Sequence, residues 1–232
     1  MDFKQKYLST GSIPLDKLLE GGFESDVLTT IYGPAGSGKT NIAITALANT
    51  LKQGKRVIFI DTEGSFSISR MLQVYPEFEK VAEKLLFLKP TNFNEQRESF
   101  DTLHKTIEVN RELFDLIIID SIAMLYRLEM GKSSDVYNVN RELGRQLGKL
   151  TELARKKSIP VIITNQVYSD FENDGVKMVG GDLLKYSSKC LIELKPSTNG
   201  LRVATLKKHR SIPEGKETVF KIVNEGLIDA EL

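Results

Sequence analysis

The segment Gly33–Thr40 reads G-P-A-G-S-G-K-T. It fits the pattern G-x-x-x-x-G-K-[ST], in which a glycine-rich loop curls so that its backbone N–H groups converge on phosphates. The run Val27–Tyr32 before it has the apolar character of a strand, and a helical pattern follows over Lys39–Lys52. A phosphate-binding loop requires this strand–loop–helix context, so the sequence predicts a P-loop nucleotide-binding protein.

The residues of this loop are predicted to hold the phosphates of ATP. The Lys39 ammonium should reach the β- and γ-phosphates, and the Thr40 hydroxyl should be a ligand of Mg²⁺. The amino terminus of the following helix adds a partial positive charge. The predicted nucleotide-binding residues are Gly33, Pro34, Ala35, Gly36, Ser37, Gly38, Lys39 and Thr40.

Short apolar runs alternate with helical patterns along the chain. The predicted strands are Val27–Tyr32, Arg56–Asp61, Leu85–Leu88, Leu116–Asp120, Val161–Asn165, Cys190–Leu194, Arg202–Leu206 and Thr218–Val223. The predicted helices are Lys39–Lys52, Ser67–Ala82, Glu95–Asn110 and Val136–Lys157. This alternation predicts an α/β fold with a mainly parallel sheet flanked by helices. The last three strands follow one another with little helix between them, which predicts an antiparallel end of the sheet.

Three polar side chains come at the carboxyl ends of predicted strands, where open α/β sheets bind their ligands. Asp120 ends a buried strand and should hold Mg²⁺ through water, although it could instead cap the next turn. Glu63 is the candidate for the group that activates the attacking water, and the alternative is a loop acid with a structural partner. Gln166 could hydrogen-bond the γ-phosphate or that water, and spacing alone leaves its role open.

The composition is that of an ordinary globular protein, with 41% hydrophobic and 27% charged residues among 232. No apolar run is long enough to span a bilayer and no secretory signal is visible, so we expect a cytoplasmic protein with no membrane partner. Cys190 lies in an apolar run and should be a buried thiol. The segment from Lys185 to Lys221 carries nine Lys or Arg against three Glu. This excess could face a polyanion or could simply be a solvated basic face.

Taken together, these residues resemble the RecA/RadA recombinase superfamily over nearly the whole chain, and in particular a short archaeal paralogue of RadA. The resemblance rests on motifs along the chain. They are L-S-T-G-S-I-P-L-D-K-L-L-E-G-G at Leu8–Gly22, F-I-D-T-E-G-S-F at Phe59–Phe66, I-I-I-D-S-I-A-M-L-Y-R at Ile117–Arg127, V-I-I-T-N-Q-V at Val161–Val167 and G-G-D-L-L at Gly180–Leu184. The resemblance implies a RecA-type core that uses ATP and Mg²⁺.

The resemblance also implies roles for individual residues. Glu63 matches the catalytic glutamate of the family, and Gln166 matches the glutamine that links the γ-phosphate to the second DNA-binding loop. The two DNA loops would fall at about Arg127–Tyr137 and Tyr168–Val179. Arg127 and Lys132 are therefore candidate DNA contacts.

The sequence K-K-H-R at Lys207–Arg210 places cationic or titratable groups side by side. The resemblance places it roughly where recombinases have a cap over the ATP of a neighbouring subunit, so this end of its strand is expected near the subunit-facing nucleotide edge. Lys208, His209 and Arg210 are candidate contacts to phosphate, either of a nucleotide or of DNA. The alternative is a solvated basic turn.

The chain departs from the RadA-type pattern in three ways. Residues 1–232 are expected to form a single ATPase domain without an N-terminal helical DNA-binding domain. Met1–Gly11 holds no Phe-x-x-Ala docking motif, and the second DNA loop is acidic, with Asp170, Glu172 and Asp174 against Lys177. Since acids repel phosphates, these departures argue against filament formation and strand exchange.

The departures therefore favour an ATP- and DNA-binding accessory protein of homologous recombination and DNA repair, with weak ATPase activity. The expected partners are single- or double-stranded DNA and a second copy in a homodimer. The resemblance implies two protein partners, the main RadA-type recombinase and a Holliday-junction nuclease. Two other functions stay open: a full strand-exchange recombinase, and a KaiC-like regulatory ATPase or kinase without a DNA role.

Overall fold

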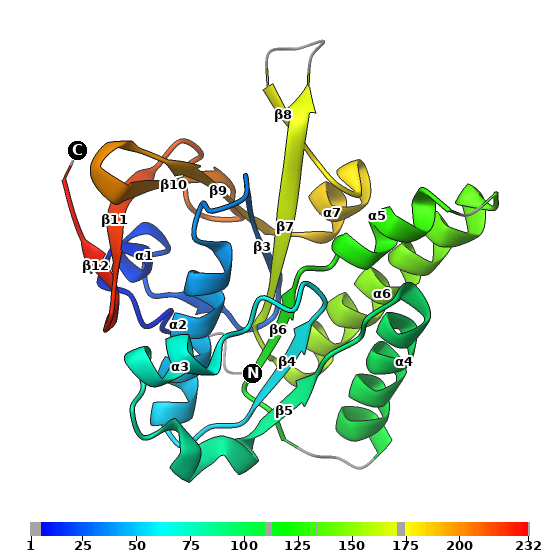
Figure 1. The fold of residues 1–232 in the computed structure, drawn as a ribbon, viewed down its shortest axis with the longest axis horizontal. Helices are drawn as coiled ribbons and strands as arrows, with labels where there is room; N and C mark the ends of the chain where they lie inside the picture. Colours follow the sequence, from blue (N-terminus) through cyan, green and yellow to red (C-terminus); the bar gives the residue numbers. More distant parts are fainter. Residues whose placement is uncertain (1–5, 110–112, 133, 171–174, 232) are drawn as a thin grey trace.

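The structure is a computed structural model that describes residues 6–109, 113–132, 134–170 and 175–231 (Figure 1). A ten-stranded sheet runs through this described part of the chain, in the order β12-β11-β10-β9-β3-β7-β6-β4-β5, with β8 paired to β7. Its strands are β3 (Leu28–Gly33), β4 (Val57–Asp61), β5 (Leu85–Leu88), β6 (Leu116–Asp120), β7 (Val161–Asp170), β8 (Gly175–Met178), β9 (Cys190–Pro196), β10 (Leu201–Lys208), β11 (Glu217–Val223) and β12 (Gly226–Asp229). The short strands β1 (Tyr7–Leu8) and β2 (Phe23–Glu24) form a separate antiparallel pair.

The sheet is parallel from β5 to β9 and antiparallel from β9 to β12. The strands β3, β4 and β6 are buried along their whole length. Continuous Ile and Val runs suit this position because both faces of the strand are covered. The predicted α/β fold with antiparallel C-terminal strands is therefore confirmed.

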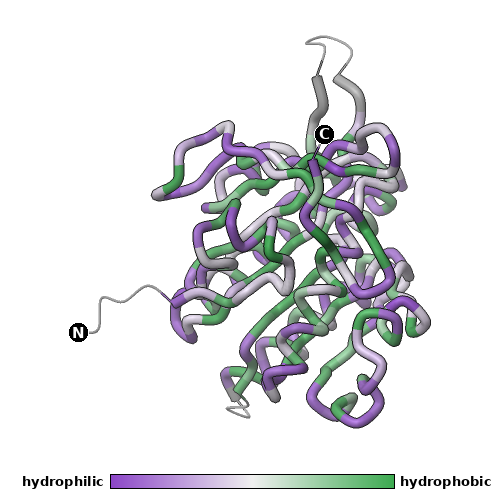
Figure 2. The backbone as a smooth tube through the Cα atoms, turned by 90° about the vertical axis from the view of Figure 1, so that its left-hand side faces the viewer, coloured by the Kyte–Doolittle hydropathy of each residue, from purple (hydrophilic) through white to green (hydrophobic). Residues whose placement is uncertain are grey.

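Helices cover the two faces of the sheet in separate groups (Figure 1). The helices α1 (Ile13–Leu18), α2 (Lys39–Lys52) and α3 (Ile68–Val74) pack on one face, over a core that includes Phe59 and Ile118. The helices α4 (Phe93–His104), α5 (Met124–Met130), α6 (Val136–Lys157) and α7 (Gly181–Ser187) pack on the other, over Ile117 and Ile119. Successive strand residues thus feed opposite cores, and Figure 2 shows hydrophobic stretches running through the middle of the fold.

The predicted helices α2 and α6 have the predicted bounds. The single helix predicted over Ser67–Ala82 is wrong, because α3 ends at Val74 and a 3₁₀ helix occupies Phe78–Lys84. Pro76 lies between them and cannot continue a helical hydrogen-bond pattern. The helix predicted to Asn110 ends as α4 at His104 and continues as a π-helical turn over Lys105–Val109. No helix of the described residues is both long and apolar enough to cross a bilayer.

The strand β7 is longer than predicted, because it continues past Asn165 to Asp170 and pairs with β8 as a hairpin that projects from the sheet (Figure 1). The predicted second DNA loop, Tyr168–Val179, lies on this hairpin. Its acidic residues Glu172 and Asp174 lie outside the described residues.

Candidate nucleotide site

The phosphate loop leaves β3 at Gly33 and enters α2 at Lys39. A Cβ atom on Gly33 would lie 2.4 Å from the carbonyl oxygen of Leu194 in β9, so only glycine fits between the two backbones. Gly38, at the amino end of α2, has a φ of 103°, a conformation that side chains disfavour. These glycines let the loop turn so that the amino terminus of α2 faces its mouth.

The loop surrounds a buried ammonium group. Lys39 is only 7% exposed, and its Nζ donates to the carbonyl oxygens of Gly33 and Pro34, each at 2.9 Å. Burial lowers the pKa of Lys39, while the carboxylates of Glu63 and Asp120 act to raise it. The buried Ser37 Oγ has no hydrogen-bond partner among the described residues. A cation, an unpaired hydroxyl and a helix amino terminus at one loop fit the phosphates of a nucleotide.

Asp120, at the end of β6, collects three hydroxyl groups. Thr40 Oγ1 donates to Asp120 Oδ2 at 2.7 Å, and Ser65 Oγ donates to the same oxygen at 3.0 Å. Thr164 of β7 donates to the other carboxylate oxygen. Burial raises the pKa of Asp120, and the negative charge of Glu63 adds to this rise, whereas the three hydroxyl donors oppose it. A hydroxyl and a carboxylate in contact beside the loop fit the magnesium ion of a nucleotide complex.

A second group of side chains surrounds Glu63. Its Oε1 accepts a hydrogen bond from Ser121 Oγ at 2.7 Å and another from Gln166 Nε2 at 3.0 Å. Glu63 follows β4, Ser121 follows β6, and Gln166 lies within β7. Two of the predicted catalytic residues, Glu63 and Gln166, are therefore in direct contact, and their catalytic roles stay predictions.

The parallel register explains why these residues meet. Asp61 lies opposite Asp120 in the β4–β6 pair, so both strands end at one edge. The Thr62 N–H donates to the Asp120 carbonyl at 2.8 Å, and the Asp61 carboxylate accepts from the N–H groups of Ser65 and Phe66 at 3.2 Å. The loop that carries Glu63 is thereby fixed against the end of β6.

The donor set also indicates which metal fits. Among the described residues, no group of three or more His, Cys, Asp or Glu side chains gathers as a metal cluster. A site in which Thr40 and Asp120 are the two protein ligands suits Mg²⁺, because this ion keeps several waters and takes its other ligands from substrate phosphates.

Of the candidate DNA residues, Arg127 lies close to this edge, because it lines a small pocket together with Ser121 and Gln166. Arg127 is exposed on α5, and Lys132 is exposed just beyond its end. The first predicted DNA loop is thus partly helical, and the contact of both residues with DNA stays a prediction.

Lys208, His209 and Arg210 do not lie at this chain's own nucleotide edge, and their contact with the ATP of a neighbouring subunit stays a prediction. The strand β10 runs antiparallel to β9, so Lys208 pairs with Leu191 near the start of β9, whereas Arg202 lies beside the phosphate loop. The sequence could not show this direction, because it depends on how β10 pairs. Contact of this cluster with a polyanion stays a prediction.

Acidic side chains hold two residues of the cluster in place. Arg210 contacts Glu24 at 2.8 Å and Asp26 at 2.6 Å, and the His209 imidazole is buried 3.8 Å from Glu24. Burial is the main cause that lowers the pKa of His209. Lys208 donates to the carbonyl oxygen of Lys185 at 2.7 Å.

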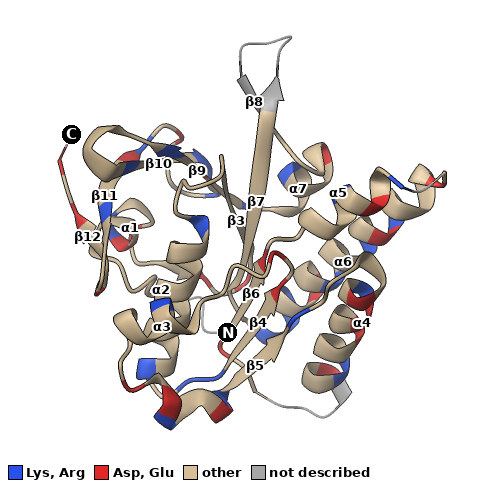
Figure 3. Cartoon of the chain, viewed as in Figure 1, with Lys and Arg blue, Asp and Glu red and all other residues tan. Residues whose placement is uncertain are grey.

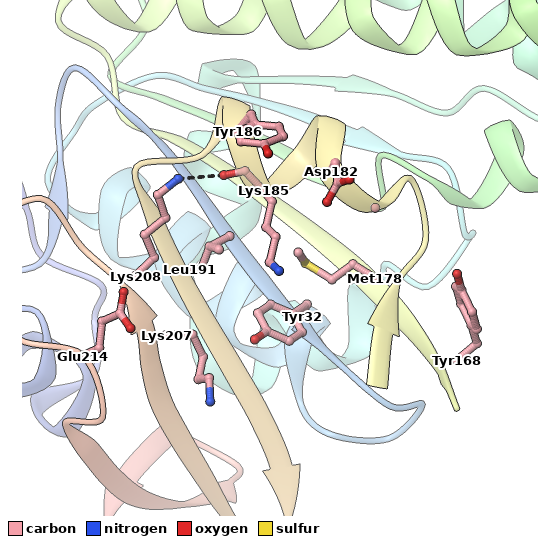
Figure 4. A pocket seen from close by; sticks show the side chains of 11 residues that line it. Tyr32, Tyr168, Met178, Asp182, Lys185, Tyr186, Leu191, Lys207, Lys208 and Glu214 are labelled. Carbon is pink, nitrogen blue, oxygen red and sulfur yellow. Dashed lines mark hydrogen bonds between the residues drawn. The ribbon is translucent and has the colours of Figure 1, made fainter. Parts of the chain in front are cut away.

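Lys208 borders a cavity of about 780 Å³ on the face of the sheet that carries α7 (Figure 4). Its other charged lining residues are Lys185, Lys207, Asp182 and Glu214. Figure 3 shows that basic residues also mark β9, β10 and α7 around it. Three residues of the basic excess, Lys185, Lys207 and Lys208, thus line this cavity together with two acids, whereas Lys216 contacts Glu20 and Arg202 contacts Gly36.

Sequence reasoning missed several residues of the site. Ser65 and Ser121 lie within the motifs that carry Glu63 and Asp120, so hydroxyl groups close to these acids were the available signal. Thr164, two residues before Gln166, lies within β7 and reaches Asp120 at the end of the neighbouring β6. Arg202 donates from Nε to the Gly36 carbonyl at 3.2 Å, and no sequence pattern indicates that contact.

The fold and this site together define a P-loop NTPase with a RecA-type core. The Rad51 family profile matches residues 4–230. The chain is 45% identical over 219 residues to the DNA repair and recombination protein RadB of Methanobrevibacter smithii, covering 92% of both chains. It is 42% identical over 225 residues to RadB of Methanococcoides burtonii, covering 97% of this chain and 98% of the relative.

A solved structure, described as the crystal structure of the RadB recombinase, superposes with a TM-score of 0.81. It is 40% identical, and the match covers 97% of this chain and 100% of that one. The chain therefore belongs to the Rad51 family and, within it, to the RadB proteins. The resemblance seen in the sequence motifs is confirmed, and members of this class generally use ATP and Mg²⁺.

Proposed function

We propose that this chain is an ATP- and DNA-binding accessory protein of homologous recombination and DNA repair, with weak ATPase activity. The observation that carries the proposal is the contact of Glu63 with Gln166 beside the Thr40–Asp120 pair. This contact joins the candidate hydrolytic centre to β7, the strand that leads into the β7–β8 hairpin. We also propose that residues 1–232 act as a single ATPase domain.

The proposed chemistry is transfer of the γ-phosphoryl group of ATP to water. Magnesium, when bound, would neutralise charge on the phosphates. Lys39 holds the phosphates, Thr40 and Asp120 hold the metal ion, and the remaining loop residues Gly33–Gly38 supply backbone N–H groups. The Glu63 carboxylate orients the water and accepts its proton. Gln166 responds to the state of Glu63 because it shares a hydrogen bond with it.

DNA is the proposed macromolecular partner. Two relatives at above 40% identity are named DNA repair and recombination proteins, and the family match favours this role over a KaiC-like kinase. Arg127 and Lys132 are proposed phosphate contacts. Lys208 is a weaker candidate for a phosphate contact than the basic residues next to it in the sequence suggest. The main recombinase is the proposed protein partner, and a nuclease or a second copy are further candidates.

The test is a fluorescence titration of labelled single-stranded DNA at several salt concentrations, with and without ATP·Mg²⁺. We expect log K to fall linearly with log salt, with a slope of about −0.7 for each phosphate contacted. We also expect ATP·Mg²⁺ to change the affinity of the parent protein and to leave that of Lys39→Ala unchanged. A flat salt response would remove the DNA role, and an ATP-independent affinity would remove the proposed coupling.

A further inference from the structure

The Ser65 hydroxyl occupies a hydrogen-bonding position on Asp120 that a water bound to the proposed magnesium ion would need. Ser65 Oγ lies 3.0 Å from Asp120 Oδ2 and 3.4 Å from Thr40 Oγ1. It is thus the third side chain at the Thr40–Asp120 contact, and it comes from the loop that carries Glu63. No part of the nucleotide-binding pattern includes it.

The two oxygens of Asp120 face different surroundings. The hydrogen bond that Thr164 donates to Oδ1 is fully buried, whereas the two bonds to Oδ2 are only partly buried. The Oδ2 atom is therefore the one that faces the site. A carboxylate oxygen has about two lone-pair positions, and Thr40 and Ser65 already fill both at Oδ2.

A metal-bound water that donates to Oδ2 must therefore displace one of these hydroxyls. Thr40 can bind a metal ion through a lone pair while its O–H still points at Asp120. Its hydrogen bond to Asp120 can therefore persist when the metal ion binds. Ser65 is held to Asp120 by its hydroxyl alone. Its backbone N–H is anchored separately, on Asp61 Oδ1 at 3.2 Å, so the side chain can turn without moving the loop.

We propose that Ser65 is a positioning residue of the magnesium site. Its hydroxyl donates to Asp120 in the place that a metal-bound water would take, and it leaves that place when the metal ion binds. This inference rests on the proposed ATP·Mg²⁺ function. The released hydroxyl lies two residues from Glu63, on the same fixed loop.

The sign of the effect separates this role from a merely structural one. Ser65→Ala removes the competitor for Oδ2, so the Mg²⁺ concentration that gives half of the Mg²⁺-dependent gain in nucleotide affinity should fall by about threefold, which corresponds to about 0.7 kcal/mol. A hydroxyl that only supports the site would raise this concentration when removed. Nucleotide affinity without Mg²⁺ should stay that of the parent, because among the described residues Thr40 is the one member of the phosphate loop that has a hydrogen bond with Ser65.

The experiment titrates Mg²⁺ into each protein with a fluorescently labelled ATP, with thermal unfolding measured to verify folding. Ser65→Thr keeps the hydroxyl and should match the parent. Ser67→Ala is the matched control, because Ser67 Oγ accepts from the Arg70 N–H at the start of α3 and makes no hydrogen bond with Asp120 among the described residues. An unchanged or raised Mg²⁺ requirement in Ser65→Ala overturns the inference alone. If the nucleotide affinity of the parent protein does not depend on Mg²⁺, the proposed function is overturned, and the inference with it.

Discussion

Replacing Glu63 by glutamine tests the hydrolytic role of this residue with little change of shape. The two donors to Glu63, Ser121 Oγ at 2.7 Å and Gln166 Nε2 at 3.0 Å, both use Oε1. A glutamine oxygen can accept both bonds, so the variant loses the charge and keeps the contacts. Each bond weakens by about 1 kcal/mol when its acceptor becomes neutral. The loss is offset in part because the negative charge near Asp120 also disappears.

We therefore expect Glu63→Gln to change the free energy of unfolding by less than about 2 kcal/mol. Its turnover should fall by about 10²- to 10⁴-fold, the usual contribution of a general base. The assays are steady-state ATP hydrolysis at saturating ATP·Mg²⁺, affinity for labelled ATP, and thermal unfolding. The exposed Glu79→Gln serves as a control for the same chemical change.

Two results would refute this reasoning. Turnover of Glu63→Gln equal to that of the parent would show that Glu63 does not activate water. A large loss of folding stability with unchanged turnover per folded molecule would instead assign Glu63 to the structural role that the sequence left open.

Three further predictions have distinct outcomes. Lys39→Ala should weaken ATP·Mg²⁺ binding at least about tenfold while the domain stays folded, since a charged donor to phosphate is worth about 1.5–3 kcal/mol; parental affinity in the same titration would contradict the assignment. Gly33→Ala should lower the free energy of unfolding by about 1–3 kcal/mol, because the new Cβ meets the Leu194 carbonyl, whereas Gly144→Ala within α6 should raise it by about 0.5–1 kcal/mol; denaturant titration measures both, and equal effects would refute the close approach. Arg210→Ala should lower the melting temperature because two ion pairs to Glu24 and Asp26 are lost, and Lys208→Ala should leave it unchanged. If Arg210→Ala weakened DNA binding without lowering the melting temperature, Arg210 would be a DNA contact and not a structural one.

Much of the fold follows from local sequence. The strand–loop–helix around Gly33–Thr40 is specified within the segment itself, because glycine conformations and strand-forming residues act over a few positions. The amphipathic stripe of α6 likewise defines its full length. Local patterns failed where a single residue interrupts a period, as Pro76 does between α3 and the 3₁₀ helix.

The sequence alone also identified Lys39 and Thr40 as candidates from the phosphate-loop motif. It identified Asp120, Glu63 and Gln166 because parallel strands bring their carboxyl ends to one edge. Tertiary structure decided which atoms meet. The Asp120 carboxylate gathers hydroxyls from α2, the Glu63 loop and β7, which are 80, 55 and 44 residues away along the chain. No local pattern encodes such contacts, because strand order determines them.

The Lys208–Arg210 cluster is a second case in which the sequence does not determine the contacts. Its charge is plain in the sequence, but its place depends on the antiparallel pairing of β10 with β9. That pairing puts Arg202 beside the phosphate loop and Arg210 against Glu24 and Asp26. Charge is a property of the residues, whereas the partner of each charge is determined by the direction in which the strand runs.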